Sequence, residues 1–205
     1  MFRFILMLTG LALALGADAL AGAARLAAHI PLTGTLDEFL VESLHRRLRE
    51  AKRLLPPPGK EKESPPPRAA ELIVFELRTK PGSVAAAVGA AEAIHKLHDE
   101  GIATVALIAG PGSASDALLA LACEQFFMTS GSALGPIVPA AFQGAAPAEA
   151  RKQLGEALDV LSAWRTRVQP IYQAFLDPAL EVHMVVFEGQ GRTPKFVLAD
   201  EYRRL

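Results

Sequence analysis

Short apolar runs alternate with helical patterns in the middle of the chain, and this alternation limits the fold more than any other feature. Leu72 to Leu77 (LIVFEL), Ala103 to Ile108 (ATVALI) and Gln125 to Met128 have the length and composition of strands. Between them lie a segment with apolar residues at helical spacing, Val84 to Leu97, and the apolar run Ala117 to Cys123. This order predicts an α/β fold with a parallel sheet and right-handed crossovers. The near-continuous LIVFEL run indicates a strand that is covered on both faces.

Further elements are predicted on the N-terminal side of this core. His29 to Leu32 is a strand candidate. Thr35 and Glu38 form a capping box, T-x-x-E, at the start of a helix. The apolar positions Leu40, Leu44, Leu48, Ala51 and Leu55 recur at helical spacing through that helix.

The C-terminal part predicts a long helix and a hairpin. Pro147 opens an amphipathic helix whose core face includes Leu154, Leu158 and Leu161, and Pro170 should kink or end it. Two apolar runs, Val182 to Phe187 and Lys195 to Leu198, flank a glycine-rich turn and predict a β-hairpin.

The first 24 residues differ from the rest. Arg3 precedes an apolar run from Phe4 to Leu15, and two A-x-A patterns follow, as in a secretory signal peptide. An uncleaved anchor is the alternative, because residues 4–24 are long enough to span a bilayer. We therefore expect one exported domain over residues 25–205, which lies outside the cytoplasm with or without cleavage. Residues 56–68 contain six prolines and predict a surface insertion in that domain.

Composition excludes several function classes. The formal net charge of −1 gives no basic field, so nucleic acid is not an expected partner. The single cysteine, Cys123, excludes an internal disulfide and a multi-cysteine metal site, and it reads as a core residue. His95 and His98 share a helix face, but no third metal ligand is evident. No metal and no cofactor are expected.

Two strand ends are the places where chemistry is expected, because sites in parallel α/β sheets form outside the carboxyl ends of strands. One is the Thr79–Ser83 turn after LIVFEL. The other is the Gly110–Asp116 loop after ATVALI, which opens onto a helix N-terminus. Free amides at such an end suit a developing oxyanion.

Three stretches resemble a known family. IPLTGTLDE, then LIVFELRTKPGSVAAA, and later VALIAGPGSASDALLALACEQFFMTSGSALGPIVPA are similar to the serine-protease domain of NfeD-like membrane proteins and to signal peptide peptidase A. The resemblance covers roughly residues 29–140 and implies a ClpP/crotonase-like fold. In that family a T-P-G-G element supplies oxyanion amides, and a small-residue run leading into a helix carries the nucleophilic serine.

The chain departs from the family pattern at each of these points. One residue is inserted in the first element, and Ser83 follows Gly82 where the family has a second glycine. Ala114 takes the nucleophile position, with Ser113 and Ser115 out of register by one. Asp116 stands where the family has a small glycine, and a carboxylate there competes with an oxyanion for the helix amides.

The family's general base is a lysine in the following helix region, and Lys152 is the matching candidate. Its alternative role is that of a surface lysine on the polar face of the helix. A lysine works as a base beside a serine only where it is desolvated.

Three functions remain open. The resemblance with its departures favours a catalytically degenerate binding or assembly module, whose partner is an envelope or membrane protein or peptide. The second is an active Ser-Lys peptidase for apolar or membrane-derived peptides, with Ser113 or Ser115 as nucleophile, Lys152 as base and oxyanion amides near Gly82. The third is a crotonase-like acyl-CoA enzyme. A homo-oligomer is expected from the family fold.

Overall fold

The computed structural model describes residues 27–54, 72–163, 169–177, 179–185 and 195–204. The predicted leader over residues 1–24 and the Pro-rich insertion over residues 56–68 lie outside them. The helices are α1 (Glu38–Leu54), α2 (Val84–Asp99), α3 (Ala114–Ala122), α4 (Pro147–Ser162), α5 (Gln169–Leu176) and α6 (Ala199–Tyr202), with a 3-10 turn, η2, at Pro139–Ala141. The strands are β1 (Ala27–Thr35), β2 (Leu72–Lys80), β3 (Ala103–Ile108), β4 (Pro111–Gly112), β5 (Gln125–Met128), β6 (Ala133–Leu134), β7 (Val182–Val185) and β8 (Lys195–Leu198).

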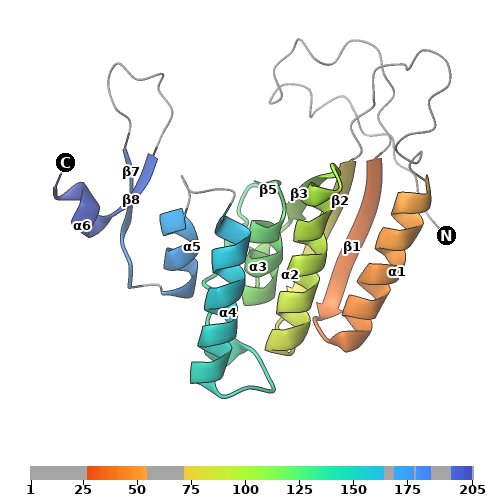
Figure 1. The fold of residues 1–205 in the computed structure, drawn as a ribbon, viewed down its shortest axis with the longest axis horizontal. Helices are drawn as coiled ribbons and strands as arrows, with labels where there is room; N and C mark the ends of the chain where they lie inside the picture. The colour runs from red at the N-terminus through yellow and green to blue at the C-terminus, as the bar shows by residue number, and fades with distance from the viewer. Residues whose placement is uncertain (1–26, 55–71, 164–168, 178, 186–194, 205) are drawn as a thin grey trace, which may run out of the picture.

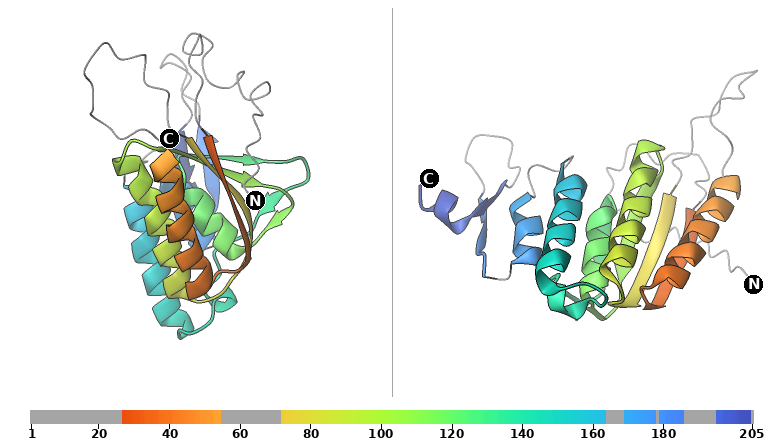
Figure 2. Two further views of the ribbon diagram at one scale, coloured as in Figure 1. Left: turned by 90° about the vertical axis from the view of Figure 1, so that its right-hand side faces the viewer. Right: turned by 60° about the horizontal axis from the view of Figure 1, so that its bottom comes forward.

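Four parallel strands form the main sheet in the order β1-β2-β3-β5, which confirms the predicted parallel α/β core. The order in the sheet is the order along the chain, so the sheet is wound in one direction only. Because each crossover is right-handed, winding in one direction puts every crossover helix on the same face of the sheet. Figure 1 and the left view of Figure 2 show α1, α2 and α4 gathered on one side of the strands.

The prediction that β2 is covered on both faces is therefore wrong. Ile73, Phe75 and Leu77 are buried under the helices. The alternate residues, which include Glu76 and Arg78, are half-buried or exposed on the other face. The prediction failed because two apolar residues of the run, Leu72 and Val74, lie on the second face, which no helix covers.

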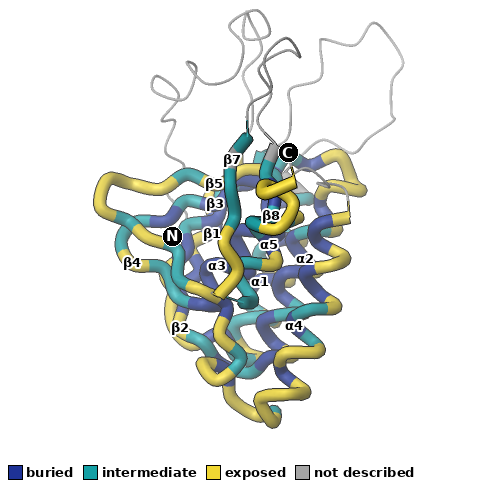
Figure 3. The backbone as a smooth tube through the Cα atoms, turned by 90° about the vertical axis from the view of Figure 1, so that its left-hand side faces the viewer, coloured by how far each residue is buried: buried dark blue, intermediate teal, exposed yellow. Residues whose placement is uncertain are grey.

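Helix α3 packs directly on the strands, and α2 and α4 pack around it. Its three central leucines, Leu118, Leu119 and Leu121, are buried, and Figure 3 shows the burial concentrated where these helices meet the sheet. The helix begins at Ala114, three residues before the predicted apolar run, so the candidate nucleophile positions lie at its N-terminus.

Two predicted local features need correction. The amide of Leu40 donates to Asp37 Oδ1 at 3.0 Å, so Asp37 caps α1 and the Thr35–Glu38 capping box does not form. Thr35 is instead the last residue of β1, paired with Lys80 of β2. Strand β2 thus runs through Thr79 and Lys80, which the sequence had assigned to a turn.

The C-terminal hairpin is confirmed, whereas the helix from Pro147 is shorter than predicted and Pro170 neither kinks nor ends it. Helix α4 ends at Ser162, and Pro170 lies in the first turn of a separate helix, α5. Strands β7 and β8 pair antiparallel as the predicted hairpin, which stands beyond α5 at the side of the molecule opposite β1 (Figure 1). Within the described residues, no helix combines the length and apolar character needed to cross a bilayer.

Candidate functional site

A cleft of about 410 Å³ lies where β2 and β3 end, at the place that the strand order predicts for a site. It is lined by Leu77, Arg78, Thr79, Lys80, Ile108, Ala109, Gly110, Pro111, Gly112, Ser113 and Asp116. The lining therefore comes from the last turn of β2 and from the loop that leads into α3. Arg78 and Lys80 bring positive charges to this lining, and Thr79 and Ser113 bring backbone amides.

Asp116 fills the inner end of this cleft with its own carboxylate. The backbone amide and the hydroxyl of Thr79 both donate to Oδ1, at 2.8 and 2.7 Å. The amide of Ser113 donates to Oδ2 at 2.9 Å, and the amide of Asp116 donates back to the hydroxyl of Ser113 at 3.1 Å. Only 2% of Asp116 is exposed. The amides that could hold an incoming anion therefore already hold an internal one.

The three consecutive residues around the nucleophile position have different environments. Ala114 is buried in the first turn of α3 and carries no reactive group. Ser113 lies before the helix as its N-cap, so its hydroxyl accepts the amide of Asp116. Ser115 is 0% exposed, and its hydroxyl lies 3.2 Å from that of Ser113. Of the two candidate serines, only Ser113 lines the cleft.

Gly82 and Ser83, the expected oxyanion residues, are not among the residues that line the cleft. Gly82 is buried against the turn between β1 and α1, where a Cβ atom would overlap the backbone carbonyl of Leu36. Its own carbonyl accepts the amide of Gln143 at 2.7 Å. Ser83 caps α2, because its hydroxyl accepts the amide of Ala86 at 3.0 Å. Both residues have structural partners, and the amides at the cleft belong to Thr79 and Ser113.

Lys152 is exposed on α4. The face of α4 that packs on the rest of the molecule carries Ala150, Leu154 and Leu158, which are buried. Lys152 is two residues from both Ala150 and Leu154, which at 100° per residue puts it on the opposite side of the helix. No contact among the described residues joins it to Ser113 or Ser115, so the structure does not bring the candidate base to the candidate nucleophiles.

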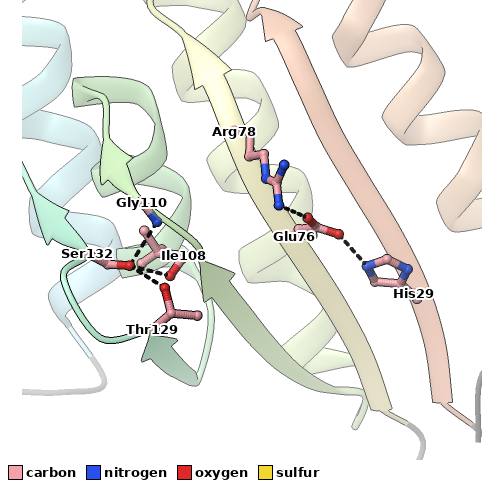
Figure 4. A network of polar contacts seen from close by, with 7 residues as sticks. All are labelled: His29, Glu76, Arg78, Ile108, Gly110, Thr129 and Ser132. Carbon is pink, nitrogen blue, oxygen red and sulfur yellow. Dashed lines mark hydrogen bonds and ion pairs between the residues drawn. The ribbon is translucent and has the colours of Figure 1, made fainter. Parts of the chain in front are cut away.

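A serine outside the cleft holds the β3–α3 loop in place. Ser132 Oγ contacts the carbonyl of Ile108 at 3.0 Å, the amide of Gly110 at 2.8 Å and the hydroxyl of Thr129 at 2.7 Å (Figure 4). Gly110 has φ = 108°, a conformation that favours glycine. The turn after β5 thereby fixes the first residues of the loop that builds the cleft.

The other residues considered as metal ligands or reactive groups do not line the cleft. His98 pairs with Glu124 at 2.8 Å, and Cys123 is buried as a reduced thiol. Over the described ranges, no three His, Cys, Asp or Glu residues cluster as metal ligands would.

The sequence matches no family model and no curated protein. Solved structures do match. The 1510-N membrane-bound stomatin-specific protease, as a lysine-to-alanine variant with a substrate peptide, aligns over 76% of this chain and 68% of its own with 18% identity and a TM-score of 0.57. Its serine-to-alanine variant aligns over 76% and 72% with 17% identity and a TM-score of 0.54. ClpP1 from Listeria monocytogenes aligns over 86% and 85% with 10% identity and a TM-score of 0.47.

The chain therefore has a ClpP/crotonase-like α/β fold, as its sequence predicts. Its likeness to the stomatin-specific protease agrees with the resemblance that its sequence shows to NfeD-like serine proteases. At these identities the likeness concerns the fold, and the chemistry has to be argued from the residues of the cleft.

Proposed function

We propose that this chain is a catalytically degenerate relative of the ClpP-like serine proteases and that it acts as a binding and assembly module. The observation that carries the proposal is the buried carboxylate of Asp116, which accepts the amides of Thr79 and Ser113. An acyl-transfer enzyme needs such amides free for the oxyanion of its tetrahedral intermediate.

An external oxyanion would have to displace a tethered one. Hydrogen bonds to a charged group contribute about 1.5–3 kcal/mol each. Asp116 accepts three of them, and all three would be lost if its carboxylate were displaced. Because the side chain is buried, water would not replace these hydrogen bonds. The competition therefore favours the internal carboxylate. It holds the β3–α3 loop in place and leaves the cleft without free amides to stabilise an oxyanion.

The candidate serines and the candidate lysine do not form a nucleophile–base pair. Ser113 uses its hydroxyl as a helix cap, and Lys152 lies on the outer side of α4. A nucleophile and its base must come within hydrogen-bond reach of each other. In subtilisin, a well-studied serine protease, removal of the serine nucleophile alone lowers kcat about a million-fold. With Ala114 in the nucleophile position, further losses at the site are nearly neutral.

We also propose that the module is exported or membrane-associated, that it meets an envelope or membrane protein or peptide, and that it forms homo-oligomers. The apolar run Phe4 to Leu15 with its A-x-A patterns supports export. The stomatin-specific protease, which shares the fold, is itself membrane-bound. Fractionation with N-terminal sequencing tests the location, and a cytosolic protein that begins at Met1 would contradict it.

The catalytic part is tested by labelling and by restoration. The wild type should not react with a fluorophosphonate probe, and it should not hydrolyse apolar peptides. The triple variant Ser83→Gly, Ala114→Ser, Asp116→Gly restores the family residues, and Ala114→Ser alone is its matched control. If the wild type hydrolyses peptides as fast as the triple variant, the chain is not degenerate.

An active serine peptidase is the second candidate, and the place of Ser113 in the cleft lining is the observation in its favour. This function requires labelling of the wild type at Ser113 and loss of that labelling in Lys152→Ala. A crotonase-like acyl-CoA function has no comparable support among the residues of the cleft.

A further inference from the structure

Strand β2 ends in two cationic side chains that point the same way. Successive side chains of a strand alternate between the faces of the sheet, so Arg78 and Lys80 share the face that has no helix layer. Both residues are exposed, and both line the cleft. They form a cationic pair at the mouth of a cleft in a protein whose net charge is −1.

The lateral neighbours of this pair carry no charge. In the β1–β2 register, Arg78 stands beside Thr33 and Lys80 stands beside Thr35. On the other side the cleft is lined by uncharged residues, from Ile108 to Ser113. No residue beside the cationic pair on β1 or in the β3–α3 loop therefore neutralises it.

Its counter-ions are few. Glu76 contacts Arg78 at 2.9 Å, but it also contacts His29 at 3.2 Å (Figure 4). No ion pair joins Lys80 to a carboxylate in the part of the chain that the structure describes. Asp116 lies deeper in the cleft, with both oxygens turned toward Thr79 and Ser113. A partner that enters the cleft therefore meets exposed cations first and a buried, hydrogen-bonded anion only behind them.

We propose that the cleft receives an acidic, extended segment of a partner protein, with carboxylates on Arg78 and Lys80. This inference rests on the proposed binding function and names the chemistry of its partner. Arg78 and Lys80 are two residues apart on one strand, which separates them by about 6.6 Å along the strand. An extended segment with acidic residues at alternate positions has the same spacing. The cleft volume of about 410 Å³ exceeds what one small anion needs and falls in the usual range for ligand sites.

Arginine and lysine contribute different contacts. The guanidinium of Arg78 can bind a carboxylate with two parallel hydrogen bonds. The ammonium of Lys80 is a point charge on a flexible stem, so it adapts to the position of the second carboxylate. Charges at an exposed rim affect the rate of association and its salt dependence most strongly.

Fluorescence anisotropy at low salt tests the proposal with the full-length protein. The probe is a fluorescein-labelled peptide of alternating glutamate and valine, and two control peptides carry glutamine or lysine in place of glutamate. We expect the glutamate peptide to bind and its affinity to fall as salt is added. The variant Arg78→Gln/Lys80→Glu should weaken this binding at least about tenfold, which corresponds to 1.4 kcal/mol. Arg49→Glu, on the exposed side of α1, should leave it unchanged.

Several outcomes would overturn the proposal. Equal binding of the glutamine peptide, unchanged binding by the charge-altered variant, or no binding of the glutamate peptide at low salt would each do so. Complete displacement by low millimolar inorganic phosphate would instead indicate a site for one small anion. Lys80→Glu alone provides a second variant that leaves the Arg78–Glu76 contact intact, should the double variant fold poorly. Hydrolysis of the peptide would contradict the proposed function itself, which separates the two failures.

Discussion

Thr79 and Asp116 are 37 positions apart in sequence and meet through two hydrogen bonds to a single carboxylate oxygen. This contact ties the end of β2 to the first turn of α3, and it occupies the amides at the inner end of the cleft. If the proposed function holds, the contact that stabilises the loop is also the one that blocks catalysis. The first prediction follows from that relationship.

Substitution of Asp116 by alanine should lower the free energy of unfolding by about 2–4 kcal/mol, because it leaves two buried donors and one half-buried donor without an acceptor. Asp116→Asn retains one acceptor oxygen and should lower it less. Urea denaturation followed by circular dichroism measures both. Asp200→Ala, at an exposed position of α6, is the control and should stay within about 0.5 kcal/mol of the wild type. An Asp116→Ala protein as stable as this control would show that the carboxylate does not hold the loop.

Gly82 and Gly89 provide a matched pair of glycines. A Cβ atom at Gly82 would overlap the carbonyl of Leu36, which is backbone and cannot turn aside. Gly82→Ala should therefore destabilise the protein by more than about 3 kcal/mol or prevent folding. A Cβ atom at Gly89 meets open space within α2, so Gly89→Ala should stabilise the protein by about 0.5–1 kcal/mol. Thermal unfolding of both variants would reveal opposite shifts, and a tolerated Gly82→Ala would contradict the close approach of the β2–α2 turn to the β1–α1 turn.

The two serines at the start of α3 should respond differently to alanine. Ser113→Ala removes the helix cap and should cost about 1 kcal/mol. Ser115→Ala replaces a buried hydroxyl whose contact is with Ser113, so its effect should be smaller. Chemical denaturation of the two variants decides the order. A larger loss for Ser115→Ala would mean that its hydroxyl has a more important partner than Ser113.

Ser132 should control the mobility of the cleft loop. Ser132→Ala removes contacts to Ile108 and Gly110, so we expect faster hydrogen exchange at the Gly110 amide and a loss of about 1–3 kcal/mol in stability. Ser130→Ala, in the exposed turn after β5, is the control. Equal exchange at Gly110 in both variants would show that the loop is held by other contacts.

Much of the fold could be predicted because its signals are local. Buried strands such as Ala103–Ile108 read as apolar runs, and the glycine that ends α2, Gly101, has φ = 74° as a helix stop requires. The extent of β2 could not be read in this way, because Arg78, Thr79 and Lys80 are polar. Their place in the sheet depends on pairing with β1, which is a tertiary property.

The site was predictable in part. The position of Asp116 at a helix start is enough to predict that it competes for amides. Its partner Thr79 is not predictable, because the contact exists only when β2 and α3 are packed together. The outward position of Lys152 could have been found from the sequence, since its spacing from Leu154 and Leu158 puts it off the buried face.

The single winding direction of the main sheet bears on how the chain folds as it is made. Each strand of the series β1, β2, β3 and β5 pairs with the strand made before it, so no strand has to wait for a later one to be inserted between two neighbours. Synthesis proceeds from the N-terminus at about 5–20 residues per second, which is slow compared with the formation of a helix or the closure of a loop. The nascent chain can therefore add one strand and its helix at a time to the growing edge of the sheet. Helix α3 is made after β2, so Thr79 can already be in the sheet when Asp116 arrives to accept its hydrogen bonds.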